Sequence, residues 1–238
     1  MSSSWILIDG DIVAYRCAYS CKDLPLYELY LKLDEVISYI INECSFFCDK
    51  GDYTIFLTGK GNFRFDIAKT AIYKGNRKDT PKPPYLEPAR QYLLMKYNTI
   101  MSQGEEADDL IGIAATKVGK GAIVASIDKD MLQIPATHFN FNRNEWKFVT
   151  EAEGMRFFYA QILAGDNADN IIGLYRVGMV TAYKMLEEAN TEQEMWDTVV
   201  KAYDGNTDRV IENARLLWLR RKEGETWHPP VAQKQKGD

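Results

Sequence analysis

The segment Trp5-Ile-Leu-Ile-Asp-Gly-Asp11 carries the first strong structural signal of the chain. A short apolar run ends here in an acidic residue, and a helical pattern continues over 12–21, which predicts a strand, a turn and a helix. The apolar runs 53–57 and 122–126 predict two more buried strands, and the second leads directly into Asp128. Helical segments between such strands favour a parallel sheet, whose ligands bind beyond the carboxyl ends of the strands.

The two parts of the chain differ in their patterns. Strand signals end at about residue 151, and helical patterns continue over 155–163, 180–188, 192–203 and 208–221. We therefore expect an α/β core over residues 1–150, with a central, mostly parallel sheet flanked by helices, and a helical subdomain over 151–222. A short basic arch is expected near 60–104, and the polar residues 223–238 are expected to form a flexible tail.

The composition argues against several classes of protein. The 238 residues include 29 basic and 34 acidic ones, and the net charge of −5 argues against binding a polyanion by bulk attraction. No run of about 18 apolar residues occurs, so we expect no membrane association and a cytoplasmic protein, in the host cytoplasm if a phage encodes it. The four cysteines, Cys17, Cys21, Cys44 and Cys48, are expected to be buried thiols, while a zinc site formed by the two pairs stays open.

Carboxylates concentrate in four short segments, 9–11, 105–109, 128–130 and 166–169. Two of these segments follow or end predicted strands, and two acids of the last segment are spaced so that both can point one way from a turn or helix. Converged carboxylates repel one another, by about 4 kcal/mol per pair at about 4 Å and an effective dielectric near 20, so such a set needs cations. Ligands that are all hard oxygen atoms indicate Mg²⁺ or Mn²⁺.

Each acidic segment also has a structural interpretation. Asp11 is expected to cap the helix that follows it, Glu105 to complement a helix N-terminus, and the acids of 166–169 can cap a helix or form a turn. The combination of acids at strand ends with an acid pair that opens the helical subdomain favours a catalytic interpretation.

A basic segment, 60–96, contrasts with these acids. It contains nine basic and three acidic residues, a local charge of +6, and prolines and tyrosines interrupt it. Such a segment suits phosphates and stacked bases. A second signal is segment 165–186, where Gly173 and Gly178 bracket a tight loop before a helix whose N-terminal amides can take a backbone phosphate. A basic segment beside an acidic metal site indicates phosphodiester cleavage.

The chain resembles the 5′-nuclease superfamily, which includes flap endonucleases, the 5′-nuclease domain of bacterial DNA polymerase I and phage 5′-3′ exonucleases. Five motifs in family order carry the resemblance: Ile8-Asp-Gly-Asp11, Tyr73-Lys-Gly-Asn-Arg77, Glu106-Ala-Asp-Asp-Leu-Ile111, Ser126-Ile-Asp-Lys-Asp-Met-Leu-Gln133 and segment 165–186. The resemblance implies a PIN-like or resolvase-like fold. It also implies a helix–three-turn–helix in segment 165–186 that grips duplex DNA, often with a bound K⁺ ion.

The resemblance further implies roles for individual residues. A first metal ion would be bound by Asp9, Glu106, Asp108 and Asp128, and a second by Asp130, Asp166 and Asp169 with Asp128 nearby. Lys74 and Arg77 would contact the scissile phosphate as catalytic residues. Candidate DNA contacts are two glycines, a threonine and three basic residues: Gly173, Gly178, Thr181, Lys184, Arg64 and Lys78.

One position departs from the family pattern. The second strand of the family usually ends in an aspartate, but here it reads Phe56-Leu-Thr-Gly-Lys60, with Thr58 or Gly59 in that place. A first ion with one fewer carboxylate ligand is expected to bind more weakly.

These observations predict a metal-dependent 5′-nuclease that hydrolyses DNA, as an exonuclease, a flap endonuclease or both, through two Mg²⁺ or Mn²⁺ ions. Its substrate would be duplex DNA with a 5′ end, a nick or a flap, and the RNA strand of a hybrid is a further candidate. We expect a monomer. Two alternatives stay open: a PIN-like ribonuclease, and a DNA-binding protein with weakened catalysis, which the change at Thr58 favours.

Overall fold

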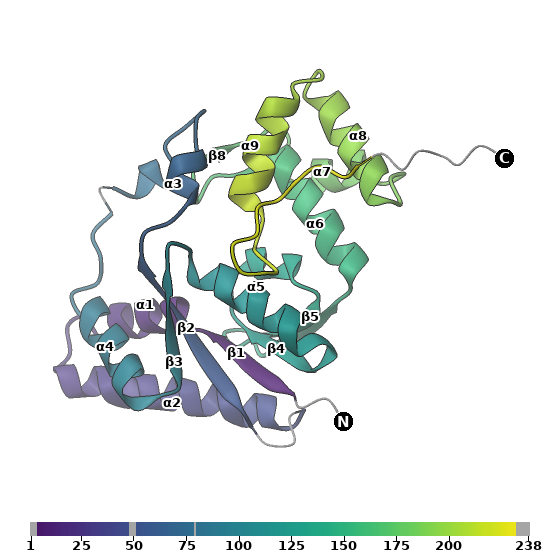
Figure 1. The fold of residues 1–238 in the computed structure, drawn as a ribbon. Helices are drawn as coiled ribbons and strands as arrows, with labels where there is room; N and C mark the ends of the chain where they lie inside the picture. Colours follow the sequence, from purple (N-terminus) through teal and green to yellow (C-terminus); the bar gives the residue numbers. More distant parts are fainter. Residues whose placement is uncertain (1–3, 48–50, 79, 232–238) are drawn as a thin grey trace. The chain divides into compact units, whose positions relative to one another are not determined.

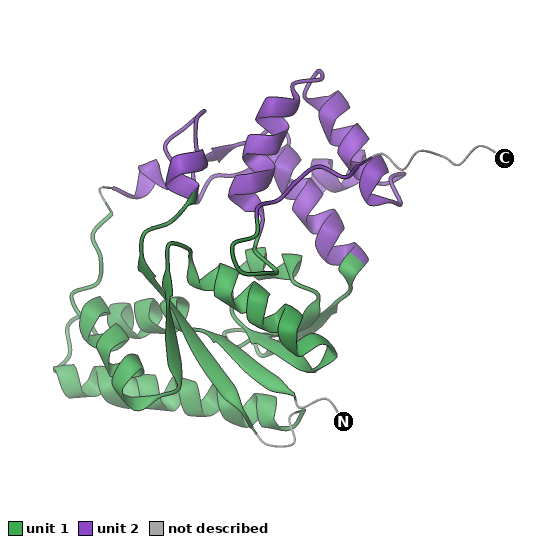
Figure 2. Ribbon diagram, in the orientation of Figure 1, with its two compact units in different colours: residues 1–63, 80–151, 219–225 green, residues 64–79, 152–218, 226–238 purple. Residues whose placement is uncertain are grey.

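The computed structural model describes residues 4–47, 51–78 and 80–231. The chain forms two compact units (Figure 2). Unit 1 comprises residues 1–63, 80–151 and 219–225, and unit 2 comprises residues 64–79, 152–218 and 226–238. The main division lies where the sequence pattern changes, after residue 151. Residues 64–79, predicted in the α/β core, belong to unit 2, whereas residues 219–222, predicted in the helical subdomain, and 223–225, predicted in the tail, belong to unit 1.

Unit 1 is built on a six-stranded sheet with the strand order β3-β2-β1-β4-β5-β6. The first five strands of this order, β3, β2, β1, β4 and β5, run parallel, and β6 pairs antiparallel with β5. The strands are β1 Trp5–Asp9, β2 Tyr53–Lys60, β3 Thr99–Gln103, β4 Ala122–Ala125, β5 Ala136–Asn140 and β6 Glu145–Val149. The predicted α/β class with a mostly parallel sheet is confirmed, and β3, β5 and β6 are additional to the strands that the sequence predicts.

Helices cover both faces of this sheet (Figure 1). On one face pack α1 Gly10–Ser20, α2 Leu26–Ser45 and α4 Leu86–Lys96, and on the other packs α5 Ala107–Val118. Alternation along β1 supplies both layers, because Ile6 and Ile8 join the cluster of α1 and α2 while Leu7 joins that of α5. The short 3₁₀ segments η2 Gly119–Gly121 and η3 Lys129–Gln133 lie before and after β4.

The predicted arch over 60–104 is not a single element. Residues 86–96 are helix α4, which is fixed to unit 1 by the fully buried Ala89 and Leu93, and residues 99–103 are the edge strand β3. Residues 64–79 belong to unit 2. Only these two residues of α4 are buried, so its apolar stripe is too narrow to be recognised in the sequence.

Unit 2 is mainly helical. Its helices are α3 Arg64–Ile67, η1 Gly75–Arg77, α6 Glu151–Ala164, which begins at the last residue of unit 1, α7 Met179–Met185, α8 Glu192–Ala202 and α9 Thr207–Leu217. A short antiparallel pair, β7 Gly165–Asp166 and β8 Ile171–Ile172, is additional to the predicted elements. The helices that the sequence predicts after residue 151 are all present, with boundaries that differ by a few residues.

Trp227 contradicts the predicted flexible tail over 223–238. Its side chain is 6% exposed, and its ring centroid lies 5.7 Å from those of Phe158 and Trp196. Burial of so large a ring holds the chain around it against the core of unit 2. Residues 232–238 of the predicted tail lie outside the described residues.

The thiols of Cys17, Cys21 and Cys44 are buried, as the sequence predicts, and burial raises the pKa of Cys17 to about 12. The fourth cysteine, Cys48, lies outside the described residues. Within the described ranges no helix is long and apolar enough to cross a membrane.

Packing of α2 against the sheet predicts a large difference between two leucines of that helix. Leu33 is fully buried and Leu31 is 58% exposed. We expect Leu33→Ala to lower the free energy of unfolding by about 2–5 kcal/mol, because it leaves a cavity in the core. Leu31→Ala is the matched control and is expected to change this free energy by less than about 0.5 kcal/mol. Urea unfolding followed by circular dichroism measures both, and equal losses would contradict the packing described.

Candidate active site

A chain of hydrogen bonds joins the carboxyl ends of β1 and β4 in unit 1. Asp9 is the last residue of β1 and the N-cap of α1, and its Oδ1 accepts from the backbone N–H of Ile12 at 3.1 Å. The hydroxyl of Ser126 donates to Oδ2 of Asp9 at 2.7 Å, and the backbone N–H of Asp128 donates to Oγ of Ser126 at 3.0 Å. The two predicted strand-end acids, Asp9 and Asp128, are therefore linked through one serine.

The carboxylate of Asp9 is held at an electrostatic cost. Its side chain is 2% exposed, and burial raises its pKa to about 7 although the hydrogen bonds from Ser126 and Ile12 oppose this. Repulsion by the carboxylates of Asp11 and Asp128 is a smaller part of the same rise in the pKa. These carboxylates are thus close enough to repel one another, and a cation bound at this edge would relieve the repulsion.

The end of β2 contains a bulge at the position where the family has its aspartate. The register between β2 and β3 shifts between Leu57 and Lys60, so that Thr58 and Gly59 lie opposite Ser102. A Cβ atom at Gly59 would lie 1.9 Å from the carbonyl oxygen of Ser102. Gly59 therefore has no room for a side chain, and Thr58 is the residue whose side chain this edge accommodates.

Thr58 connects three helices at this edge. Its backbone N–H donates to Oδ2 of Asp11 at 2.9 Å, and its Oγ1 accepts from the backbone N–H of Ala107, the first residue of α5, at 2.9 Å. The guanidinium of Arg90, from α4, donates to both the carboxylate of Asp11 and the carbonyl oxygen of Thr58. Asp11 is structural, as expected, but it ties α1 to β2 and α4, and Asp9 is the residue that caps α1.

The acids at the start of α5 form a capping box. The side chain of Glu106, the N-cap, accepts from the backbone N–H of Asp109, and the backbone N–H of Glu106 donates to Oδ2 of Asp109 at 3.1 Å. The preceding acid, Glu105, pairs with Arg220 at 2.9 Å. Asp108 lies partly exposed in the first turn of α5, and Asp130 follows Asp128 in η3, where its N–H donates to Oδ1 of Asp128 at 2.9 Å.

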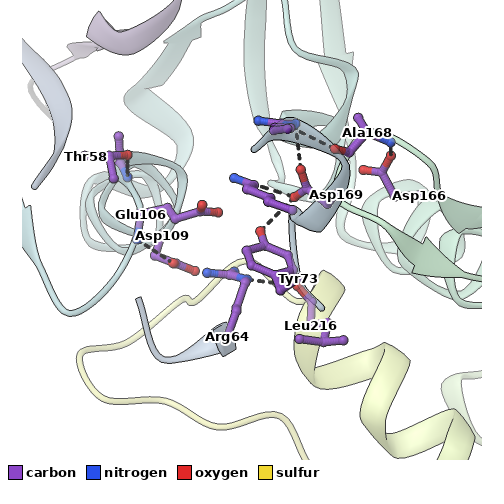
Figure 3. Close-up of polar contacts among 12 residues, drawn as sticks. Thr58, Arg64, Tyr73, Glu106, Asp109, Asp166, Ala168, Asp169 and Leu216 are labelled. Atoms are coloured by element: carbon purple, nitrogen blue, oxygen red, sulfur yellow. Dashed lines mark hydrogen bonds and ion pairs between the residues drawn. The ribbon is translucent and has the colours of Figure 1, made fainter. Parts of the chain in front are cut away.

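In unit 2 the basic motif is fastened to the loop between β7 and β8. The carboxylate of Asp169 accepts from the hydroxyl of Tyr73 at 2.7 Å and from Nη2 of Arg77 at 2.7 Å, and Nζ of Lys74 lies 3.7 Å from it (Figure 3). Backbone contacts reinforce this, since the N–H of Lys74 donates to the carbonyl oxygen of Asp169 at 2.9 Å. Both oxygens of Asp169 are engaged, so in this structure it orients Lys74 and Arg77, and its role as a metal ligand stays a prediction.

Lys74 has a backbone conformation that lysine rarely adopts. Its φ of +53° lies in the left-handed region, which costs a residue with a side chain of order 1 kcal/mol or more. Such a conformation persists where the surrounding structure fixes it, here through the contacts of Lys74 with Asp169. Nearby, Asp166 is buried, and its Oδ1 accepts from the backbone N–H of Ala168 at 2.8 Å, which makes the loop compact.

One of the predicted DNA contacts is corrected by the structure. Arg64 is 1% exposed, and its guanidinium donates to the carbonyl oxygens of Leu216 and Trp218 at 2.8 Å each, so it supports the core of unit 2 (Figure 3). Gly173 is needed for packing, because a Cβ atom there would lie 2.3 Å from the backbone nitrogen of Gly165, but it is partly exposed and its predicted DNA contact stays a prediction. The remaining contacts, Gly178, Thr181, Lys184 and Lys78, are exposed and stay predictions.

The predicted metal ligands are divided between the units. Asp9, Glu106, Asp108, Asp128 and Asp130 belong to unit 1, and Asp166 and Asp169 belong to unit 2. Among the residues that the structure describes, no three His, Cys, Asp or Glu side chains form a group that could hold a metal ion. Sequence reasoning missed Arg90, Ser126 as a bridge between acids, and Tyr73. A serine two residues before Asp128, at the end of a predicted strand, was the one available signal for Ser126.

A parallel α/β sheet with linked aspartates at its carboxyl edge defines a resolvase-like class of domain. Residues 4–156, more than half of the chain, match the model of a family described as the N-terminal resolvase-like domain of 5′-3′ exonucleases. The chain belongs to this family of 5′-3′ exonucleases, and the predicted 5′-nuclease superfamily is confirmed.

Relatives include stand-alone exonucleases and polymerases. The 5′-3′ exonuclease of Buchnera aphidicola subsp. Schizaphis graminum is 28% identical over 217 residues, which cover 82% of this chain and 74% of the relative. The DNA polymerase I of Caldicellulosiruptor bescii is 25% identical over 244 residues, 91% of this chain but only 28% of the polymerase.

Solved structures show the same fold. A zinc-bound 5′-exonuclease of bacteriophage T5 has a TM-score of 0.69 at 17% identity, and the match covers 90% of this chain and 89% of that one. The catalytic core of Rad2 in complex with a DNA substrate has a TM-score of 0.52 at 13% identity, covering 87% of this chain and 67% of that one.

The bulge at the end of β2 predicts that Gly59 cannot be replaced. We expect Gly59→Ala to lower the free energy of unfolding by about 1–3 kcal/mol, because the methyl group would have to displace the backbone of Ser102. Gly178→Ala is the control, since nothing lies within 4 Å of a Cβ atom there, and it should cost less than about 1 kcal/mol. Urea denaturation compares the two, and an equally mild effect at Gly59 would refute the close approach of β2 to β3.

Proposed function

We propose that this chain is a divalent-metal-dependent nuclease that hydrolyses phosphodiesters of DNA at or near 5′ ends. The observation that carries the proposal is the pair of acids Asp9 and Asp128, joined through Ser126 at the carboxyl edge of a 5′-3′ exonuclease fold. A buried carboxylate, Asp9, beside the partly exposed carboxylate of Asp128 is stabilised by a bound cation, and this edge is where ligands of parallel sheets bind.

The donor atoms of this edge suit Mg²⁺ or Mn²⁺. Mg²⁺ is commonly held by only one or two carboxylates, and water and substrate phosphates complete its six ligands. The described residues hold no larger cluster of ligands, so Asp9 and Asp128 serve as the starting site, and Asp130, Asp108 and Glu106 are further candidates of unit 1. When bound, such an ion polarises a phosphate oxygen and lowers the pKa of water. The two-metal form of the same proposal adds a second ion, which Asp130, Asp166 and Asp169 would bind.

The basic motif of unit 2 supplies positive charge for the phosphate. Lys74 and Arg77 are oriented by Asp169, and their side chains are 23% and 51% exposed, so both can reach a ligand. Charge fixed in advance in this way stabilises negative charge that develops during phosphodiester hydrolysis. In this proposal Asp169 and Tyr73 position the two cations, and the cations contact the phosphate.

DNA is the proposed substrate because two of the similar structures are described as complexes with DNA, the Rad2 core and the flap endonuclease of bacteriophage T5. Nicked or flapped duplex, a K⁺ ion at segment 165–186, action on the RNA strand of a hybrid, a monomeric state and a cytoplasmic location belong to the same proposal. A DNA-binding protein with weak catalysis is the second candidate, since Gly59 has no room for the strand-end carboxylate of the family.

Removal of one acid should separate catalysis from binding. Asp128→Asn keeps the size of the side chain and its capping oxygen, but it removes a negative charge from the edge that holds the metal. We expect its cleavage of a 5′-labelled nicked duplex in Mg²⁺ to fall at least about 100-fold, while its duplex affinity in EDTA, measured by fluorescence anisotropy, stays unchanged. In the unmodified protein, EDTA should abolish cleavage and Mg²⁺ or Mn²⁺ should restore it, whereas Ca²⁺ should not.

The control for this experiment is Asp23→Asn, whose side chain is 85% exposed and which is expected to behave like the unmodified protein. Cleavage that survives both EDTA and Asp128→Asn would overturn the proposed metal dependence. Binding without cleavage in the unmodified protein, at any concentration of Mg²⁺ or Mn²⁺, would support the second candidate.

The charge of Lys74 can be removed without loss of the fold, because glycine readily adopts the backbone conformation of this residue. Lys74→Gly suits a φ of +53° and should raise the free energy of unfolding by up to about 1 kcal/mol, but it removes the cation. We expect cleavage at saturating Mg²⁺ to fall by about 100-fold or more. Asn144→Gly relieves the same conformation at a φ of +53° in the β5–β6 turn and should stabilise the protein without changing cleavage. Unchanged cleavage by Lys74→Gly would show that Lys74 has no catalytic role.

A further inference from the structure

A cavity in unit 1, on the face of the sheet that α1 and α2 cover, is lined by aromatic rings. It has a volume of about 480 Å³ and lies among α1, α2 and the turn that follows β5, and we call it the tyrosine cavity. Tyr15 and Tyr19 come from α1, Tyr39 from α2 and Phe141 from the β5–β6 turn. This volume falls within the roughly 300–1,000 Å³ of small-molecule sites, and its walls offer flat apolar surface.

The charged residues that line the tyrosine cavity are both positive, and its other polar residues, such as Ser20 and Asn142, are neutral. Arg16 and Lys32 line it, and no carboxylate does so in the described part of the chain, although the chain as a whole has a net charge of −5. Cys17 adds no negative charge, because burial raises the pKa of its thiol to about 12. The cavity is therefore complementary to an anion.

Both cations are free to turn toward a ligand at little cost. Lys32 pairs with Glu35 at 3.0 Å, but both side chains are largely exposed, and such surface pairs contribute little. Arg16 is exposed, and its Nη2 donates to the neutral side chain of Asn142 at 2.6 Å. An anion would replace that neutral acceptor by a charged one, which makes a stronger hydrogen bond.

The residue that Arg16 contacts also connects the tyrosine cavity to the candidate active site. Asn142 lines a second cavity of about 460 Å³, whose other lining residues include Ser126 and Asp128. Asn142 therefore lines both cavities, so a small molecule released at the edge that holds Asp9 and Asp128 is close to the tyrosine cavity of the same unit. The chemistry of that molecule, under the proposed function, is a nucleotide with a 5′-phosphate.

We propose that the tyrosine cavity binds a nucleoside 5′-monophosphate, with the base against the aromatic rings and the phosphate at Arg16 and Lys32. The proposal rests on the proposed function, because it takes the released nucleotide as the ligand. Stacking of a base on aromatic side chains and pairing of a phosphate with arginine are the two interactions that the cavity offers together.

Calorimetric titration of the full chain with dAMP in EDTA tests the site without any contribution from a bound metal. We expect dAMP to bind more tightly than deoxyadenosine or inorganic phosphate alone, since each of these satisfies only one half of the cavity. Tyr19→Ser and Arg16→Gln should each weaken dAMP binding about fivefold or more. Tyr27→Ser and Lys117→Gln are the controls: Tyr27 is 58% exposed against 59% for Tyr19, the Lys117 side chain is 65% exposed, neither control residue lines the cavity, and binding should not change.

The outcomes separate this inference from the proposed function. The inference would be overturned if dAMP did not bind. It would also be overturned if Asp128→Asn abolished dAMP binding while Tyr19→Ser and Arg16→Gln left it intact. In either case, cleavage of DNA in Mg²⁺ would still support the nuclease. A third result would also overturn the inference: dAMP does not bind, but a short single strand binds and this binding needs Tyr19. The cavity would then bind an unpaired base of the substrate instead of the released nucleotide. Absence of DNA cleavage by the unmodified protein would refute the proposed function instead.

Discussion

Parallel pairing of β1 with both β2 and β4 is the constraint on which the rest of unit 1 depends. The side chains of β1 are buried on both faces, so a slip by one residue would exchange Ile6 and Ile8 with Leu7 between the two helical layers. The register is therefore fixed, and it decides that Asp9 lies level with Phe56 of β2 and beside the end of β4. The hydrogen bonds of the carboxyl edge follow from that position.

The acids of the molecule fall into two electrostatic groups. Asp9 is buried beside other carboxylates, and only hydrogen bonds offset the cost of its charge, so its pKa is raised. Asp169 is surrounded by Lys74, Arg77 and the hydroxyl of Tyr73, so its charge is already compensated. An acid that lacks compensation can gain from a cation, whereas a compensated acid holds its cationic partners in place. This difference distinguishes the carboxyl edge from segment 166–169, although both are acidic clusters in the sequence.

The elements of the fold with the strongest local signal could be predicted from the sequence. The apolar runs of β1, β2 and β4 end in polar residues, and helical patterns separate them, so the parallel sheet and the edge position of its acids followed from periodicity alone. Predictions for single charged residues were weaker, because charge does not reveal burial. Arg64 lies in a basic run and was expected to contact DNA, but two backbone carbonyl groups far along the chain accept its hydrogen bonds in the core.

The edge of β2 shows why the remaining contacts could not be predicted. The sequence shows that the strand-end carboxylate is missing, but not that the carbonyl oxygen of Ser102 fills the space where a side chain at Gly59 would lie. Arg90 is 79 residues from Asp11 along the chain, and no local pattern indicates that it donates to both Asp11 and Thr58. The change at this position is therefore more than the loss of one ligand. Thr58, Asp11 and Arg90 form a different edge, in which the ion pair of Asp11 and Arg90 holds the backbone of Thr58, and the hydroxyl oxygen of Thr58 accepts from the first residue of α5.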